Sequence, residues 1–167
     1  MNAQIAQEVS ESELVGDSEY ISTGKQYLTF VLGGESFGVD ILSVKEIRGW
    51  DDATLVPNSP IYVKGVVNLR GTIVPIIDLR IRFEVGEINY VSTTVVIILS
   101  GKTDAGKRTV GFIVDAVSDV LDVENSDLKP SPGFDGSVPA NYIHGLVNTN
   151  ENVVTMLDVD HLLSLDS

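Results

Sequence analysis

The sequence contains no cysteine, so neither a disulfide bond nor a thiolate metal site can stabilise the fold. It has only two histidines, His144 and His161, and they lie in unrelated sequence contexts. A histidine-based metal site would need further ligands nearby, and acidic side chains on a protein surface are usually solvated. We therefore expect no bound metal and no cofactor.

Basic residues are scarce, because 11 Lys and Arg stand against 24 Asp and Glu, which gives a net charge of −13. A field of this sign repels phosphates, so nucleic acid and anionic membrane surfaces are disfavoured as partners. Part of the charge lies in residues 1–24, which contain acidic residues but no Lys or Arg. We expect this segment to be a flexible acidic lead-in, because it lacks the basic start and apolar core of a signal peptide.

Long apolar runs are also missing, since the longest stretches, such as Val95 to Leu99, have the length of a strand. A membrane-spanning helix would need about 18 consecutive apolar residues. The 167 residues are 43% apolar, which suits one compact domain or two small ones. We expect a soluble, cytoplasmic protein with no direct membrane insertion.

Short runs rich in Val, Ile, Thr and aromatic residues, separated by turn residues, predict a mainly β fold. Residues 44–50 fit either a bent strand or a helical turn, and residues 61–64 predict one helical turn after Pro57 and Pro60. Residues 124–139 predict a long loop, and Asp158 predicts the N-cap of a short closing helix. The predicted strands are 26–32, 37–42, 66–69, 72–79, 93–99, 109–115 and 153–159.

An internal repeat organises the chain. Residues 63–79 (VKGVVNLRGTIVPIIDL) align without a gap with residues 143–159 (IHGLVNTNENVVTMLDV), a shift of 80. A weaker match, at a shift of 73, aligns residues 37–47 with residues 110–120. Average residue usage would give about one identity by chance in the first alignment. The first alignment contains five identical pairs, which are Gly65/Gly145, Val67/Val147, Asn68/Asn148, Val74/Val154 and Asp78/Asp158. The repeat predicts two related lobes of about five short strands each, which close into small barrels.

The repeat separates residues needed by the fold from residues with another role. Gly65 recurs and indicates a backbone position with no room for a Cβ, while Asn68 and Asp78 recur and indicate turn or cap hydrogen bonds. Pro75 does not recur and predicts an edge strand or a bulge. Arg70 does not recur either. A turn arginine is usually solvated, but an arginine isolated among apolar neighbours is also typical of an interface anchor.

A serine hydrolase is the main alternative class. Gly34 to Gly38 (GESFG) match the G-x-S-x-G pattern, with Ser36, Asp78 and His144 in the expected order. A nucleophile elbow, however, needs a strand, a sharp turn and a helix, whereas this serine lies between two predicted strands. A phosphate-binding loop is also disfavoured, because GKTDAGKR (101–108) lacks the required spacing.

Three stretches in order, YLTFVLGGESFGVDILSVKEIRGW, KGVVNLRGTIVPIIDLRIRF and VGFIVDAVSDVLDV, closely resemble the CheW family of bacterial chemotaxis coupling proteins. The resemblance runs from about residue 26 to about residue 165. It implies two five-stranded SH3-like β-barrels with short helices, and no catalytic activity. It also implies two partners, the regulatory domain of the histidine kinase CheA and the cytoplasmic tip of methyl-accepting chemotaxis receptors.

The same resemblance implies a set of partner-binding residues. The valines among them are the weaker members, because a valine in a β run is usually part of the core. For Glu46 and Arg70 we hypothesise that the two side chains are neighbours at the rim of an apolar groove, where they orient a partner. The implied residues are Val44, Glu46, Gly65, Arg70, Val95, Val96, Val117 and Val120.

The expected organisation is an acidic segment at residues 1–24 and a CheW-like domain at residues 25–165. The first lobe covers about 25–88 and the second about 89–165, with strand exchange between them left open. The same domain also occurs fused to a receiver or within the kinase, but the end of the chain at Ser167 favours a stand-alone protein. We expect it to be recruited from the cytoplasm to membrane-associated receptor arrays. Receptor class, affinities and the lobe that each partner contacts are left open.

Overall fold

The computed structural model describes residues 25–50, 62–130, 138–150 and 152–164, and it shows the predicted mainly β fold with two short helices. The acidic segment at 1–24, Pro57, Pro60 and Ile61 lie outside the described residues. The elements are β1 (Lys25–Leu32), β2 (Glu35–Asp40), the 3₁₀ helix η1 (Ile41–Ser43), β3 (Val44–Gly49), β4 (Val63–Leu69), β5 (Thr72–Asp78), α1 (Leu79–Phe83), β6 (Val95–Thr103), β7 (Gly106–Val114), β8 (Ala116–Val123), η2 (Asn125–Asp127), η3 (Ala140–Tyr142), β9 (Ile143–Asn148), β10 (Val153–Leu157) and α2 (Val159–Leu163).

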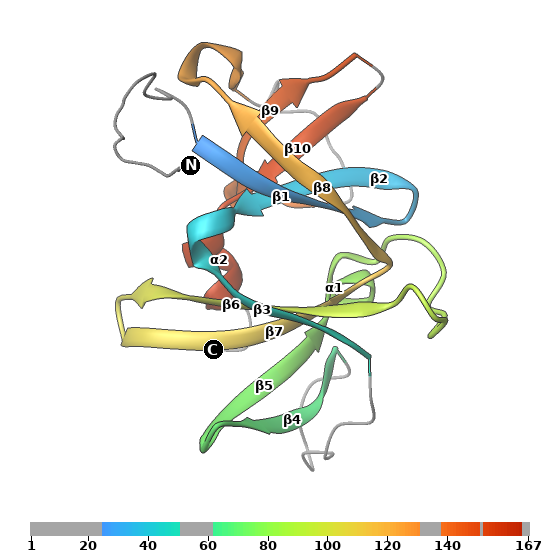
Figure 1. The fold of residues 1–167 in the computed structure, drawn as a ribbon, viewed down its shortest axis with the longest axis vertical. Coiled ribbons are helices and arrows are strands. Elements are labelled where there is room, and N and C mark those ends of the chain that lie inside the picture. Colours follow the sequence, from blue (N-terminus) through green and yellow to red (C-terminus); the bar gives the residue numbers. More distant parts are fainter. Residues whose placement is uncertain (1–24, 51–61, 131–137, 151, 165–167) are drawn as a thin grey trace, which may run out of the picture.

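The strands form two five-stranded sheets (Figure 1). Sheet A has the strand order β8-β1-β2-β10-β9, and sheet B has the order β3-β6-β7-β5-β4. The chain therefore passes from sheet A to sheet B through η1, and it returns to sheet A between β7 and β8. Strands from both halves of the sequence contribute to each sheet. The predicted lobe boundaries stay a prediction.

The predicted repeat appears as two matching hairpin–helix units. The hairpin β4–β5 leads into α1, and the hairpin β9–β10 leads into α2. Asp78 caps α1 by accepting a hydrogen bond from the backbone of Arg80, and Asp158 caps α2 by accepting one from His161. The amide of Asp78 donates to the Tyr62 carbonyl at 2.8 Å, and the amide of Asp158 donates to the carbonyl of residue 142 at 2.7 Å. The predicted cap role of both aspartates is confirmed.

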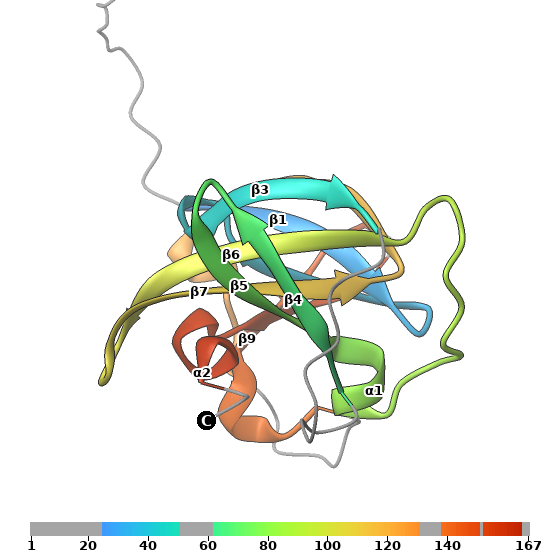
Figure 2. The same cartoon turned by 90° about the horizontal axis from the view of Figure 1, so that it is seen from below.

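The main hydrophobic core lies between the two sheets, and each sheet curls around a smaller cluster of its own. Figure 2 shows the curl of sheet B, with the β4–β5 hairpin folded back toward β3. The main core contains Leu28, Phe30, Leu32, Phe37, Val39, Ile77, Leu79, Phe83, Ile97, Leu99, Phe112, Leu162 and Leu163 among others. The cluster inside sheet B contains Val74, Ile76, Val96, Ile98 and Ile113, and that of sheet A contains Tyr27, Val123, Val147, Val154 and Met156.

Several local predictions are corrected. Residues 44–49 are a strand, which settles the alternative left open for that stretch. The helical turn predicted at 61–64 is wrong, because β4 already begins at Val63, where ladder pairing to Ile77 overrides the local turn signal. The predicted loop at 124–139 contains η2, and Lys129 forms a β-bridge with Leu146. Residues 131–137 of that loop lie outside the described residues.

Pro75 does not lie in an edge strand, because β5 is placed between β4 and β7. Its pairing is nevertheless one-sided at this position. Pro75 pairs with Val66 of β4, whereas the parallel ladder from β5 to β7 begins only at Ile76. The missing N–H of proline is therefore tolerated in an inner strand, because β5 is paired on only one side at Pro75.

Candidate partner-binding site

Arg70 is presented by a tight two-residue turn between β4 and β5. Leu69 pairs with Thr72, and the two residues between them have positive φ, 51° for Arg70 and 86° for Gly71. The side chain of Asn68 closes the turn, because its Oδ1 accepts a hydrogen bond of 2.8 Å from the Gly71 amide. A non-glycine residue in the left-handed region costs about 1 kcal/mol. The fold thus holds Arg70 in a conformation that glycine or asparagine would adopt more easily.

The guanidinium of Arg70 lies beside Glu46 of β3, as hypothesised from the sequence. Arg70 Nη2 is 3.4 Å from Glu46 Oε1, and Arg48 Nη1 is 4.0 Å from the other carboxylate oxygen, Oε2. The Arg70 side chain is 81% exposed, whereas that of Glu46 is 26% exposed. Glu46 belongs to β3 and Arg70 follows β4, and these two strands are the edge strands of sheet B.

The charged residues of β3 share a face with the small core of sheet B. In the ladder between β3 and β6, Glu46 lies opposite Ile98 and Arg48 lies opposite Val96. Directly opposed residues in an antiparallel ladder point to the same side of the sheet. Val96 is 4% exposed and belongs to that core, so it is enclosed by packing. Gly65 is buried in β4 with φ 144°, which agrees with its predicted need for no Cβ.

The other predicted valines lie on the faces that the two sheets turn toward each other. Val44 and Val95 are half-buried against the main core from sheet B, and Val117 is half-buried against it from sheet A. Val120 of β8 lies opposite Leu28 of the main core, yet it remains 45% exposed. These residues therefore form an apolar margin between the sheets, on strands different from the one that presents Arg70.

The sequence interpretation did not assign roles to two residues that extend this surface. Ile47 lies opposite Ile97 of the main core and is 42% exposed, so it continues the apolar margin along β3. Arg48 provides the second cation beside Glu46. Both stand in the quoted motif V-K-E-I-R, and strand alternation from Glu46 would have placed Arg48 on the same face.

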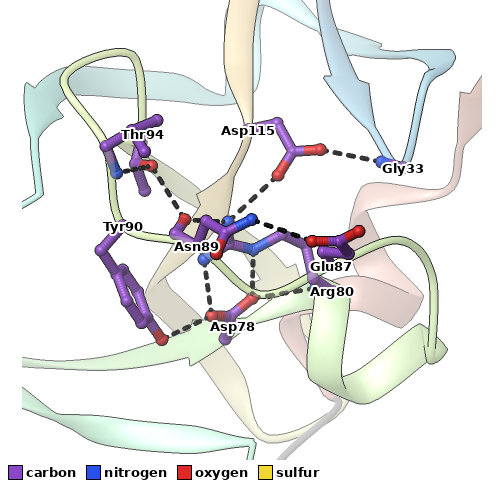
Figure 3. A network of polar contacts seen from close by, with 9 residues as sticks. Gly33, Asp78, Arg80, Glu87, Asn89, Tyr90, Thr94 and Asp115 are labelled. Atoms are coloured by element: carbon purple, nitrogen blue, oxygen red, sulfur yellow. Dashed lines mark hydrogen bonds and ion pairs between the residues drawn. The ribbon is translucent and has the colours of Figure 1, made fainter.

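The sequence interpretation also missed a buried polar cluster centred on Arg80, which is 1% exposed (Figure 3). The Arg80 guanidinium binds Asp78 in a bidentate manner, with Nε to Oδ1 and Nη2 to Oδ2 both at 3.0 Å. Its Nη1 donates to the Asn89 carbonyl at 2.6 Å and to Asp115 Oδ1 at 3.1 Å. The Tyr90 hydroxyl donates to Asp78 Oδ2 at 2.8 Å. We call these five residues the Arg80 cluster.

The environment of this cluster shifts two pKa values. Burial lowers the pKa of Arg80, but hydrogen bonds to Asp78 and Asp115 and their charges outweigh burial and hold the pKa above its ordinary value. Burial, followed by the hydrogen bond to Asp78, raises the pKa of Tyr90 to about 12. The cluster thus consists of a permanent cation between two carboxylates, with a neutral phenol on one of them.

The serine hydrolase alternative has no supporting geometry. Ser36 lies within β2, paired with Val31 on one side and Val154 on the other, and not on a turn into a helix. Asp78 already binds Arg80 and Tyr90 through both carboxylate oxygens.

Within the described ranges, no group of three or more His, Asp or Glu side chains is placed so that it could hold a metal ion. In the same ranges, no helix is long and apolar enough to cross a membrane.

Comparison with known proteins identifies the family that shares this sequence and fold. The family model described as the CheW-like domain matches residues 26–167. The chain is 43% identical over 153 residues to the chemotaxis protein CheW of Klebsiella aerogenes, covering 92% of this chain and 87% of that protein. It is 30% identical to the chemotaxis protein CheW of Bacillus subtilis, covering 88% and 92%. The crystal structure of the scaffolding protein TtCheW from Thermoanaerobacter tengcongensis superposes with a TM-score of 0.74 at 29% identity, covering 83% and 92%. The chain therefore belongs to the CheW-like domain family.

Proposed function

We propose that this protein is a non-catalytic adaptor of bacterial chemotaxis that couples the cytoplasmic tips of chemoreceptors to the regulatory domain of the histidine kinase CheA. Relatives of similar length are named chemotaxis proteins, and one of them is described as a scaffolding protein. The adaptor would act in the cytoplasm and be recruited to receptor arrays at the membrane.

The observation that carries the proposal is the Arg70–Glu46 pair. An exposed ion pair adds only about 0–1 kcal/mol to stability, and Arg70 keeps this position although its backbone conformation is unfavourable. Stability alone therefore does not account for an arginine on this turn. Arginine is enriched among the residues that dominate binding energy at protein interfaces, because its planar fork binds carboxylates with defined geometry.

The arrangement supports a division of tasks within one interface. The apolar margin of Val44, Ile47, Val95, Val117 and Val120 offers a surface on which apolar side chains of a partner lose contact with water. Arg70 and Glu46 lie on the adjoining edge of sheet B, where they can fix the orientation and register of the bound segment. A helix of the receptor tip or a loop of the kinase domain fits this description.

A pull-down tests the adaptor role. The purified chain, immobilised, is offered a purified receptor-tip fragment and a purified CheA regulatory domain, first separately and then together. The proposal expects capture of each partner alone and of both from the mixture. Capture of neither partner by the folded chain would overturn it. Arg70→Ala should capture one or both partners less well than the parent chain. Lys107→Ala is the control for the loss of a surface cation, because Lys107 is exposed at the start of β7 and distant in sequence from the proposed site.

A further inference from the structure

The Arg80 cluster joins the two sheets at one point. Arg80 lies in α1, directly after β5 of sheet B, while Asp115 is the single residue between β7 and β8, where the chain crosses to sheet A. Asp115 uses both carboxylate oxygens, because Oδ1 accepts from Arg80 and Oδ2 accepts a 2.8 Å hydrogen bond from the amide of Gly33. Gly33 belongs to the β1–β2 turn of sheet A (Figure 3). One carboxylate thus connects an arginine of one sheet to the backbone of the other.

Two further contacts strengthen this junction. The Asp115 amide donates to the Val31 carbonyl of β1 at 3.0 Å. The turn at Gly33 and the loop at Gly86 also meet backbone to backbone, because a Cβ on Gly86 would lie 2.6 Å from the Cα of Gly33. That loop continues to Asn89, whose carbonyl is bound by Arg80. The two sheets therefore contact each other here through directional polar bonds and close backbone packing.

The main core between the sheets is apolar. The main core consists of Leu, Ile, Val and Phe side chains from both sheets and both helices. Apolar burial drives the sheets together but is non-directional, so it does not by itself select one rotation of one sheet on the other. Hydrogen bonds with fixed geometry do select one, because a rotation would break the bonds from Asp115 to Arg80 and Gly33.

The repeat shows that Arg80 and Asp115 are not part of the duplicated fold, although their neighbour Asp78 is. At the shift of 80 the counterpart of Arg80 is Asp160, and at the shift of 73 the counterpart of Asp115 is Leu42. Leu42 lies in η1, the other crossover between the sheets, and its side chain is exposed. One crossover therefore carries an ion pair to a buried arginine, and the other has an exposed leucine at the equivalent position. Buried ion pairs are often no more stabilising than apolar residues of similar volume, so stability is a weak reason for this one.

We propose that Arg80 is a positioning residue that fixes the orientation of sheet B against sheet A and thereby sets the spacing between the two parts of the partner-binding site. Arg70 and Glu46 stand on sheet B, whereas Val117 and Val120 follow Asp115 directly on β8 of sheet A. The role in binding rests on the proposed function, whereas the role in sheet orientation does not.

The absence of cysteine makes the orientation directly measurable. Lys45→Cys on β3 and Ser118→Cys on β8 introduce two exposed labelling sites, which are counterparts in the repeat and lie one on each sheet. Pulsed electron paramagnetic resonance of the doubly nitroxide-labelled protein gives the distance distribution between the sheets. We expect one narrow distribution in the otherwise unchanged chain. Asp115→Asn should broaden or shift it, because the amide removes the carboxylate charge that links Arg80 to sheet A, while Arg80 keeps its pair with Asp78.

Two further variants make the result decisive. Arg80→Lys keeps the buried charge but loses the planar fork, and it should broaden the distribution as well. Leu42→Ala changes the other crossover and should leave the distribution narrow. A broad distribution in the labelled parent, or an unchanged narrow one in folded Asp115→Asn and Arg80→Lys, would overturn the proposal.

Binding to the receptor tip and to the kinase regulatory domain separates this inference from the proposed function. The inference expects Asp115→Asn to weaken binding of a partner that contacts both sheets by about tenfold, with Leu42→Ala unaffected. Parent-like binding by an Asp115→Asn protein with a broadened distribution would overturn the positioning role and leave the proposed function intact. Loss of all binding by the parent chain would instead contradict the proposed function and leave the orientation result standing.

Discussion

Arg70 and Glu46 join the two edge strands of one sheet. Glu46 belongs to β3 at one edge of sheet B, and Arg70 stands on the turn that ends β4 at the other edge, with 3.4 Å between Nη2 and Oε1. Three strands separate those edges in the sheet order, but the curl of the sheet brings the β4–β5 hairpin back toward β3 (Figure 2), and the ion pair joins the two edges there. The contact lies where the sheet comes back on itself, on the solvent side of its small apolar core.

The ion pair is expected to add little to stability. In a double-mutant cycle of Glu46→Ala and Arg70→Ala, the coupling free energy of unfolding should be at most about 1 kcal/mol, because Arg70 is solvent-exposed. Chemical denaturation of the four proteins measures it. A coupling of several kcal/mol would show that the pair holds the sheet closed, and would remove the reason for assigning it to partner binding.

The two capping aspartates should differ strongly in their contribution to stability. Asp158→Ala removes a cap of α2 and should lower the free energy of unfolding by about 1 kcal/mol. Asp78→Ala removes the equivalent cap and also leaves the buried Arg80 without its bidentate partner, so a loss of about 3–5 kcal/mol is expected. Denaturant titration of both variants makes the comparison. Equal losses would contradict the buried charge pairing, since both aspartates cap equivalent helices but only Asp78 is fully buried against an arginine.

Tyr90 should titrate later than an ordinary tyrosine. Its folded-state pKa of about 12 lies above the ordinary 10.0, so folding favours the neutral phenol. This contribution to stability is fully present below pH 10 and is lost as the pH rises from 10 to 12. The expected loss is about 1 kcal/mol, less than the whole shift would give, because Tyr90 is 39% exposed.

The difference in tyrosinate absorbance between the parent chain and Tyr90→Phe isolates this group from the other tyrosines. Burial and the charge of Asp40 also raise the pKa of Tyr27, so the two proteins must be compared directly. A difference titration centred near pH 10 while both proteins remain folded would contradict the buried contact between Tyr90 and Asp78.

Local structure could be predicted where the sequence repeats itself. The identical aspartates at 78 and 158 cap equivalent helices, and Asn68 bonds to the turn amide of Gly71, because caps and turns depend on residues only a few positions apart. The matching hairpins before those helices follow from the same identities. The error at residues 61–64 arose where a long-range ladder overrode a local turn signal.

Long-range arrangement was harder to predict. No local pattern tells that β3 pairs with β6, or that β8 returns to pair with β1. That Glu46 and Arg70 lie next to each other could be proposed only as a hypothesis, from the family resemblance. Arg80 was missed although it stands with its partner Asp78 in the quoted D-L-R motif, since arginine is almost never fully buried and its second partner, Asp115, lies 35 residues away.

The binding of Arg70→Ala tests the central claim most directly. Isothermal titration calorimetry of the parent chain and this variant against the receptor-tip fragment and the CheA regulatory domain gives the affinities, and a thermal melt of each protein reports the fold. We predict at least tenfold weaker binding of one or both partners, as expected for an interface residue worth more than about 1.4 kcal/mol, with the melting temperature nearly unchanged. Parent-like affinity for both partners in a folded Arg70→Ala protein would contradict the account.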